Sequence, residues 1–383
     1  MRIGSSTIPY VQSSASQDVP PPYHFPDVTV QAFIWPAQIT AVQNYCDNFL
    51  NLGTRDERGF EYRPLAAWPY AMLLFLDYPE MISSAREPVD IGETPYPERG
   101  ITSQREVFVC LPVVRYGNGA LGRIADTDIE CVLPFIVVSK PWSCVCGREM
   151  LGLGKLLAEI DMKEGRYPDS FQGAVRLPGW ASNRPGEMLK IRPLLDVDTG
   201  PVLPTFRLEK SPEKSLATLF QSPAASLAIS TMSDLSNFTD FASAGLFPTA
   251  MRTLGLKQYR DAKYPDRAIY QALVSCRSQY SNLRDMRMYD EDNVRIRVHD
   301  TGSFHDILQV VLDVGPEPSG KVIETKPIAA FRFKADVDYA HMRVVHEFPI
   351  TGSDGIVARP AQSDLSARWF RPIKGFFSTP RLP

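Results

Sequence analysis

The stretch Gly147-Arg148-Glu149-Met150-Leu151-Gly152-Leu153-Gly154-Lys155 begins with an adjacent pair of opposite charges and ends on a lysine among apolar and small residues. Apolar residues recur at helical spacing from position 150 to position 160, so the sequence predicts a helix over residues 147–160. Leucines surround Lys155 at positions 151, 153, 156 and 157. A lysine on an amphipathic helix is usually exposed to solvent, but these neighbours make Lys155 a candidate for a buried amine.

Two further segments flank this stretch in chain order. Upstream, residues 106–113 (Glu-Val-Phe-Val-Cys-Leu-Pro-Val) open on a glutamate and are typical of a buried strand. Downstream, residues 188–193 (Met-Leu-Lys-Ile-Arg-Pro) have the composition of another strand. Together the three segments resemble the acetoacetate decarboxylase family, whose signature is Gly-Arg-Glu followed by a few apolar or small residues and Pro-Lys. The resemblance covers about residues 28–208, and strands after residue 294 are expected to complete the same fold.

The resemblance implies a catalytic role for the lysine. In that family the lysine attacks a ketone carbonyl and forms a Schiff base, an electron sink that lets a neighbouring carbon–carbon bond break. For this sequence it implies that Lys155 is the nucleophile and that Glu106 faces the same pocket, where a carboxylate can orient substrate or move protons. Burial among apolar side chains disfavours the ammonium form and frees the amine. Arg148 and Glu149 are expected to support the site as an ion pair or network, whereas Glu106 could also be an outward polar residue at a strand start.

Four positions depart from the family pattern. Leu156 stands where well-known decarboxylases have a second lysine, and Gly154 replaces the proline before the catalytic lysine. No arginine begins the first expected strand, at Val28, and the strand at 70–76 contains no glutamate. The reaction is therefore open between β-keto-acid decarboxylation and the aldol and dehydration chemistry of related members. The lost charges predict weak acetoacetate decarboxylation and a larger, less charged carbonyl substrate.

The distribution of apolar runs predicts an α+β fold. We expect an extended arm over residues 1–27, followed by a mainly antiparallel β-barrel or cone over 28–210, of acetoacetate decarboxylase type, with flanking helices and the catalytic lysine on one of them. Ser211 and Pro212 are typical of a helix start, so residues 211–290 are predicted to be a helical insertion that includes a helix over 268–277. Strands over 291–350 return to complete the core, and residues 351–383 form a polar tail.

The overall composition excludes several classes of function. With 41 Lys and Arg against 44 Asp and Glu, the 383-residue chain has a formal charge of −3 and no basic excess for binding nucleic acid. The longest apolar runs, 70–76 and 131–138, fall far short of the roughly 20 residues that span a membrane. Residues 1–14 lack the apolar stretch of a secretory signal, and six cysteines do not make a disulfide framework in a chain of this size. A cytoplasmic location is the resulting expectation.

The sequence therefore predicts a Schiff-base-forming lyase, either a decarboxylase or an aldol or dehydratase-type enzyme, that acts on a small keto or oxo acid. The imine itself is the electron sink, so no metal or organic cofactor is expected, and the expected partner is the small carbonyl substrate. The spacing of His299, Asp300, His305 and Asp306 suits no recognised metal site, and these residues are interpreted as polar loop residues. Two alternatives stay open, a non-catalytic ligand-binding protein and an assembly protein with the same fold. A homo-oligomer is likewise left open.

Overall fold

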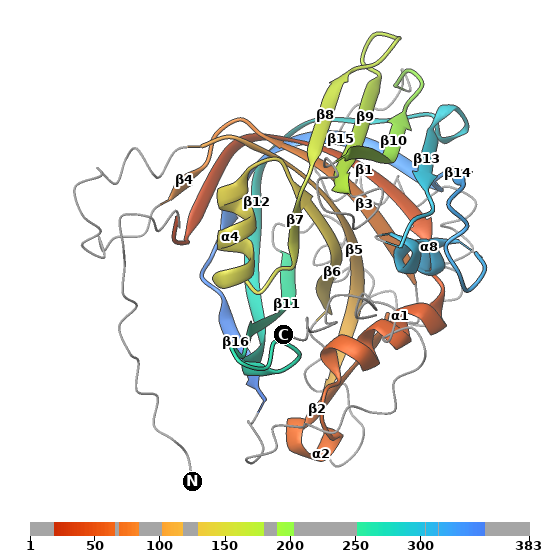
Figure 1. The fold of residues 1–383 in the computed structure, drawn as a ribbon. Helices are drawn as coiled ribbons and strands as arrows, with labels where there is room; N and C mark the ends of the chain where they lie inside the picture. The colour runs from red at the N-terminus through yellow and green to blue at the C-terminus, as the bar shows by residue number, and fades with distance from the viewer. Residues whose placement is uncertain are drawn as a thin grey trace, which may run out of the picture.

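The computed structural model describes residues 19–65, 69–83, 102–117, 129–179, 190–202, 251–302, 304–312 and 314–348. These residues form two β-sheets, one of 11 strands and one of five, with short helices at their edges (Figure 1). Within the described ranges, none of the helices combines the length and the hydropathy needed to cross a membrane.

The elements have the following bounds. The larger sheet contains β1 (Tyr23–Pro36), β2 (Phe60–Pro64), β3 (Tyr70–Tyr78), β4 (Ile82–Ser83), β5 (Gln104–Gly117), β6 (Ile129–Val138), β7 (Lys155–Leu157), β11 (Met251–Arg260), β12 (Ala268–Met288), β15 (Ala329–Tyr339) and β16 (Arg343–Glu347). The smaller sheet contains β8 (Glu159–Glu164), β9 (Phe171–Gly179), β10 (Lys190–Asp198), β13 (Arg295–His299) and β14 (Val322–Thr325). The helices are α1 (Ile39–Tyr45), η1 (Cys46–Leu50), α2 (Arg55–Arg58), α4 (Pro141–Glu149), η3 (Glu291–Asn293) and α8 (His305–Val311).

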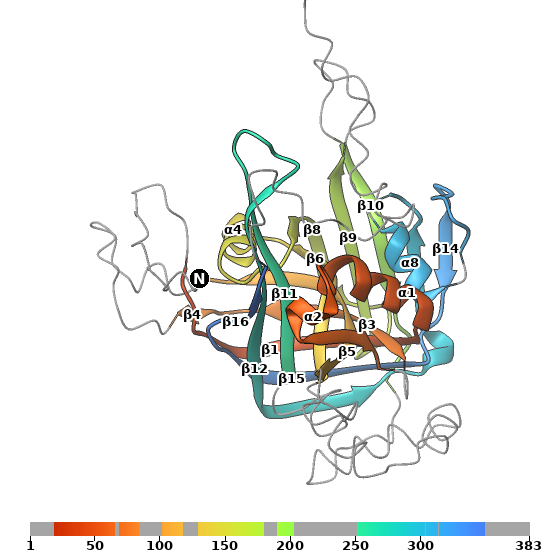
Figure 2. The same ribbon diagram turned by 90° about the horizontal axis from the view of Figure 1, so that it is seen from below.

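The strands of the larger sheet pair in a closed cycle. Their order is β5, β3, β1, β15, β12, β11 and β6, and β6 pairs again with β5. The pairing is antiparallel except between β11 and β6 and between β6 and β7, which are parallel. The sheet is therefore mixed, with antiparallel pairing between most of its strands. Its strands curve around a common interior that is visible from two directions in Figures 1 and 2.

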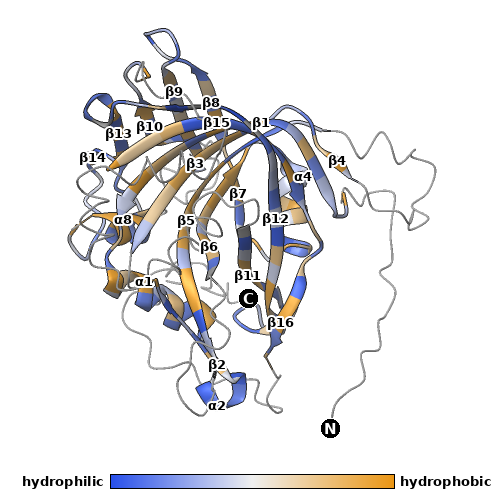
Figure 3. Cartoon of the chain, turned by 180° about the vertical axis from the view of Figure 1, so that it is seen from behind, coloured by the Kyte–Doolittle hydropathy of each residue, from blue (hydrophilic) through white to orange (hydrophobic). Residues whose placement is uncertain are grey.

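Period-2 alternation along the strands separates two apolar cores. On β5, Phe108 and Cys110 point into the cluster inside the cycle, whereas Val107 and Val109 point to the outer cluster. The outer cluster also contains Leu195 and other residues of the smaller sheet, so this sheet packs against the outside of the larger one. Figure 3 shows the hydrophobic colour along β5 and β6 that burial on both faces requires.

The chain around the predicted catalytic lysine differs from the expected helix. Helix α4 begins at Pro141, a residue well suited to the first helical turn, and ends at Glu149. Gly152 then adopts a φ of +63°, which glycine tolerates and which reverses the chain direction. Lys155 follows as the first residue of strand β7, so the prediction that it lies on a helix is wrong.

The predicted helical insertion is also corrected where the structure describes it. Residues 203–250 lie outside the described residues, but β11 and β12 form an antiparallel hairpin from Met251 to Met288. The predicted helix over 268–277 is part of β12, because this strand finds pairing partners in β11, β15 and β16. Such long-range pairing overrides the local preference of a sequence.

The remaining boundaries differ in smaller ways. The first strand begins at Tyr23 rather than residue 28, because residues of the expected arm already pair with β15. Of the strands expected over 291–350, β15 and β16 join the larger sheet, whereas β13 and β14 join the smaller one. Residues 1–18 of the arm and the tail at 351–383 lie outside the described residues.

Candidate active site

Strand β6 positions the two predicted catalytic residues on either side of itself. Its Val138 is in register with Glu106 on β5, and its Ile136 is in register with Lys155 on β7. Helix α4 packs against both β6 and β7. Glu106 and Lys155 are therefore held by the hydrogen bonds of a sheet, although 49 residues separate them in the sequence.

Lys155 and Glu106 form a buried ion pair. The distance from Lys155 Nζ to Glu106 Oε2 is 2.5 Å, and the two residues are 6% and 7% exposed. Lys155 Nζ also donates to Ser143 Oγ at 3.3 Å. Charges at such depth are unfavourable unless they are paired and hydrogen-bonded, so Glu106 and Ser143 stabilise the charged form of the lysine side chain.

Gly147 provides the space for the lysine side chain. A Cβ atom at this position would lie 2.6 Å from Cδ of Lys155 and 2.8 Å from its Cε. The carbonyl of Gly147 accepts a 2.8 Å hydrogen bond from the Leu153 amide, which fixes the turn before Lys155. The glycine of the Gly-Arg-Glu segment is therefore in contact with the amine-bearing side chain.

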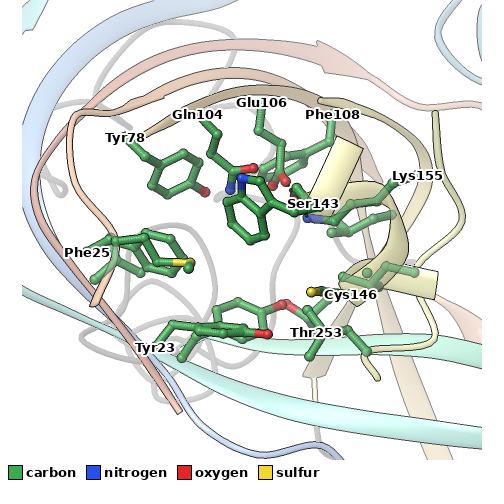
Figure 4. A pocket seen from close by; sticks show the side chains of 18 of the residues that line it. Tyr23, Phe25, Tyr78, Gln104, Glu106, Phe108, Ser143, Cys146, Lys155 and Thr253 are labelled. Atoms are coloured by element: carbon green, nitrogen blue, oxygen red, sulfur yellow. Dashed lines mark hydrogen bonds and ion pairs between the residues drawn. The ribbon is translucent and has the colours of Figure 1, made fainter. Parts of the chain in front are cut away.

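The ion pair borders a cavity of about 50 Å³ inside the strand cycle (Figure 4). Phe25, Phe108, Leu151 and Val337 are among its apolar walls. Among the described residues that line it, Glu106 and Lys155 are the charged ones. Figure 4 shows Gln104, Glu106 and Lys155 directed into this space.

Three buried polar side-chain atoms at the cavity have no hydrogen-bond partner. They are Oε1 of Gln104, a residue that is 5% exposed, Nε1 of Trp142 and Oγ1 of Thr253. A buried donor or acceptor without a partner costs about 1–3 kcal/mol. A ligand group that reached one of these atoms would regain this free energy.

Three tyrosines of the cavity remain protonated at neutral pH. Burial raises the pKa of Tyr78, Tyr280 and Tyr339, and the nearby Glu106 carboxylate raises the pKa of each further. Their hydroxyl groups are therefore neutral donors or acceptors and add no negative charge to the site.

Arg148 and Glu149 do not form the expected ion pair with each other. Both are exposed, and Arg148 Nη1 donates to the backbone carbonyl of Lys155 at 3.4 Å. The backbone carbonyl of Glu149 accepts from the hydroxyl of Tyr259 at 2.6 Å. Arg148 thus contacts the lysine through the backbone, and Glu149 ties α4 to β11.

Gln104, Ser143 and Trp142 are among the polar residues of the site that sequence reasoning missed. Gln104 lies two positions before Glu106, so the strand alternation could have placed it on the same face. Ser143 and Trp142 lie about one helical turn before Gly147, but their position depends on α4, which the predicted helix boundaries did not include. All three line the cavity.

A second cavity of about 500 Å³ lies next to the first. It is lined by residues of α1, α8 and β11, and it shares Leu133 and Leu153 with the smaller cavity. These two leucines therefore form part of the wall of both.

Two of the histidine and aspartate residues that the sequence brought together, His305 and Asp300, form a buried pair in another part of the molecule. His305 Nδ1 lies 2.6 Å from Asp300 Oδ1, and both residues are 2% exposed, which corrects their interpretation as polar loop residues. Within the described part of the chain, no group of three or more His, Cys, Asp or Glu residues could hold a metal ion.

The chain matches no family model and no curated protein. Among solved structures, it is similar to acetoacetate decarboxylase from Legionella pneumophila subsp. pneumophila str. Philadelphia 1, at 10% identity and a TM-score of 0.50, over 90% of this chain and 94% of that chain. A second acetoacetate decarboxylase structure is similar at 10% identity and a TM-score of 0.47, over 88% and 93%. The enduracididine biosynthesis enzyme MppR, complexed with the condensation product of pyruvate and imidazole 4-carboxaldehyde, is similar at 13% identity and a TM-score of 0.48, over 89% and 98%.

The similarity to the Legionella protein concerns nearly the whole of both chains, and it identifies a fold class of mainly β proteins with few helices. The chain has the acetoacetate decarboxylase-like fold. This confirms the prediction made from the three sequence segments.

Proposed function

We propose that the chain is a Schiff-base-forming enzyme in which Lys155 attacks a small carbonyl compound. The observation that carries the proposal is the 2.5 Å contact between a buried amine and a buried carboxylate at the edge of a cavity. The keto and oxo acids implied by the resemblance are the first candidates within this substrate class. A cavity of about 50 Å³ favours small molecules, which argues against the larger substrate expected from the lost charges.

The ion pair supplies the proton transfers of imine formation. Glu106 takes a proton from the Lys155 ammonium, and the free amine attacks the carbonyl carbon. The carbonyl oxygen receives protons, in part from Glu106, and leaves as water when the carbon–nitrogen double bond forms. The resulting iminium carries the positive charge that the ammonium carried before, so Glu106 still faces one cation.

The iminium then withdraws electrons from the adjacent carbon. Loss of CO2, of a proton or of an aldehyde from that carbon gives the same enamine, so decarboxylase and aldol or dehydratase chemistry share this step. We infer that Glu106, which contacts Lys155 Nζ, accepts or returns the proton at this carbon. The iminium provides the electron sink itself, and these steps use only the side chains of the chain.

The decisive experiment is reduction with borohydride in the presence of small carbonyl compounds, followed by peptide mapping by mass spectrometry. We expect Lys155 to be labelled and Lys155→Ala to abolish the label. Lys257→Ala is the matched control, because Lys257 is half-buried and desolvation lowers its pKa, although the charge of Glu149 opposes this. A label that persists in Lys155→Ala and disappears in Lys257→Ala would show that the nucleophile is Lys257 and not Lys155.

A non-catalytic ligand-binding protein is the second candidate. It is favoured by the lining of the cavity, where the described residues offer no cation besides Lys155 to hold a substrate carboxylate. Exchange of hydrogen for deuterium at the carbon next to the carbonyl separates the two functions, because exchange requires the enamine. A protein that binds carbonyl compounds without catalysing this exchange has only the binding function.

A further inference from the structure

The charges and the unpaired atoms of the cavity indicate which class of small carbonyl compound it binds best. This inference rests on the proposed Schiff-base function. Glu106 and Lys155 balance each other, and they are the charged residues among the described residues that line the cavity. A keto acid would add a carboxylate with no further cation to pair it. Because a buried unpaired charge is strongly unfavourable, this lining disfavours acids and favours neutral carbonyl compounds.

The unpaired atoms define which polar group a neutral ligand needs. Oε1 of Gln104 is an acceptor, so it requires a donor from the ligand, whereas Nε1 of Trp142 is a donor and requires an acceptor. Oγ1 of Thr253, the third unpaired atom, can donate or accept and therefore does not distinguish between ligand groups. A carboxylate provides acceptors alone and leaves Gln104 Oε1 without a partner. A hydroxyl group both donates and accepts, so it satisfies both requirements.

The size of the cavity limits the rest of the molecule. A water molecule needs at least about 10–15 Å³ on this measure of volume, so a cavity of about 50 Å³ favours ligands of a few non-hydrogen atoms. Hydroxyacetone is smaller than either pyruvate or acetoacetate.

We propose that this site takes a small neutral hydroxyaldehyde or hydroxyketone in preference to a keto acid. The carbonyl carbon forms the imine with Lys155 and releases water, as for any carbonyl substrate. The hydroxyl group is unchanged in this step, donates to Gln104 Oε1 and accepts from Trp142 Nε1. Gln104 and Trp142 are therefore the specificity-determining residues of the site.

The test compares hydroxyacetone with pyruvate, because the two differ only in carrying a hydroxymethyl or a carboxylate group on the same methyl ketone. The rate of cyanoborohydride trapping on Lys155 is measured at equal concentrations and divided by the rate with free N-acetyl-lysine. We expect hydroxyacetone to react at least about tenfold faster than pyruvate after this correction, the factor that corresponds to one lost hydrogen bond. Equal or faster reaction of pyruvate overturns the proposal, whereas failure of every carbonyl compound to label Lys155 overturns the Schiff-base function instead.

Two variants test the contacts themselves, with acetone as the matched ligand that lacks the hydroxyl group. Gln104→Met and Trp142→Phe should each lower the ratio of hydroxyacetone trapping to acetone trapping about tenfold, because acetone makes no hydroxyl contact that the variants could remove. Trp142 is half-buried at the start of α4, so Trp142→Phe tests the proposal even if Gln104→Met does not fold. A ratio of hydroxyacetone to acetone that stays constant in a folded variant overturns the assignment.

Discussion

Two buried side-chain pairs in this molecule, Lys155 with Glu106 and His305 with Asp300, differ in their surroundings. Asp300, which contacts His305, also accepts 2.7 Å hydrogen bonds from the amide and the hydroxyl of Ser319. The backbone amide of Asp300 donates a hydrogen bond to the Lys321 carbonyl, and the Asp300 carbonyl accepts one from the Gly320 amide. Lys155 and Glu106 instead border a cavity that also contains unpaired polar atoms.

The difference separates a structural pair from a reactive one. The hydrogen bonds of Asp300 connect α8 to the loop before β14. Protonating Asp300 or removing one of its partners would therefore disrupt the packing of these two segments. At Lys155 the adjacent space allows a ligand to approach the amine without displacing protein atoms. Substitutions in the two pairs should therefore affect different quantities, and three experiments examine this difference.

The largest effect is expected for Glu106→Gln, which removes the proton acceptor and keeps the shape of the side chain. Imine trapping on Lys155 should remain detectable but become slower, because Glu106 no longer takes the ammonium proton, and deuterium exchange at the carbon next to the carbonyl should slow about 10²–10⁴-fold, the usual contribution of a general base. Proton NMR of hydroxyacetone or pyruvate in D2O measures the exchange, with Lys155→Ala as the background. Unchanged exchange in a variant that still forms the imine would assign proton transfer to another group.

Asp300→Ala should reduce stability without affecting the chemistry. Removal of one partner from a buried pair costs about 3–5 kcal/mol, which denaturant unfolding at pH 7 measures. Trapping on Lys155 per folded molecule should be unchanged. A loss of trapping in the folded variant would show that the two pairs are coupled.

The stability difference between wild type and Asp300→Ala should depend on pH. Burial alone raises the pKa of Asp300, but hydrogen bonds from Ser319 and His305 outweigh burial and lower it. A carboxyl group with a lowered pKa stabilises the folded state above its unfolded pKa, near 3.9, and loses this contribution as the pH falls through the folded value. The stability difference between wild type and Asp300→Ala should therefore be constant above about pH 5 and shrink below pH 4.

The smallest effect is expected for Gly147→Ala, in which the added methyl group would displace the side chain of Lys155. The new Cβ would lie 2.6 Å from Lys155 Cδ, and a misplaced amine should slow imine trapping roughly tenfold, within the range that a shift of about 1 Å produces. Gly154→Ala is the matched control, because a Cβ there meets no atom within 4 Å. Equal rates in both variants would indicate that the lysine relaxes without cost.

The sequence predicted the parts of the molecule whose signal is local. Strands near 70–76, 106–113 and 129–139 are present as β3, β5 and β6, because continuous apolar runs mark strands that are buried on both faces. It also predicted that Glu106 and Lys155 face one pocket, and the two side chains are in contact. The roles of these residues remain a prediction.

The failures arose where distant partners decide the local structure. The apolar residues after Gly147 have helical spacing, yet Gly152 reverses the chain and residues 155–157 pair with the available edge of β6. The hairpin of β11 and β12 is likewise stabilised by strands far away in the sequence. Trp142 and Ser143 were missed for a related reason, because only the observed start of α4 brings them to the cavity.

The wall formed by Leu133 and Leu153 separates a space for a few atoms from a space about ten times larger. Two aliphatic side chains are thus part of what limits the size of the ligand. Shortening either leucine would enlarge both spaces and leave the lysine and its carboxylate in place. In a fold of this kind, single substitutions of wall residues such as Leu133 or Leu153 can allow longer substrates to bind without changing the residues that perform the chemistry.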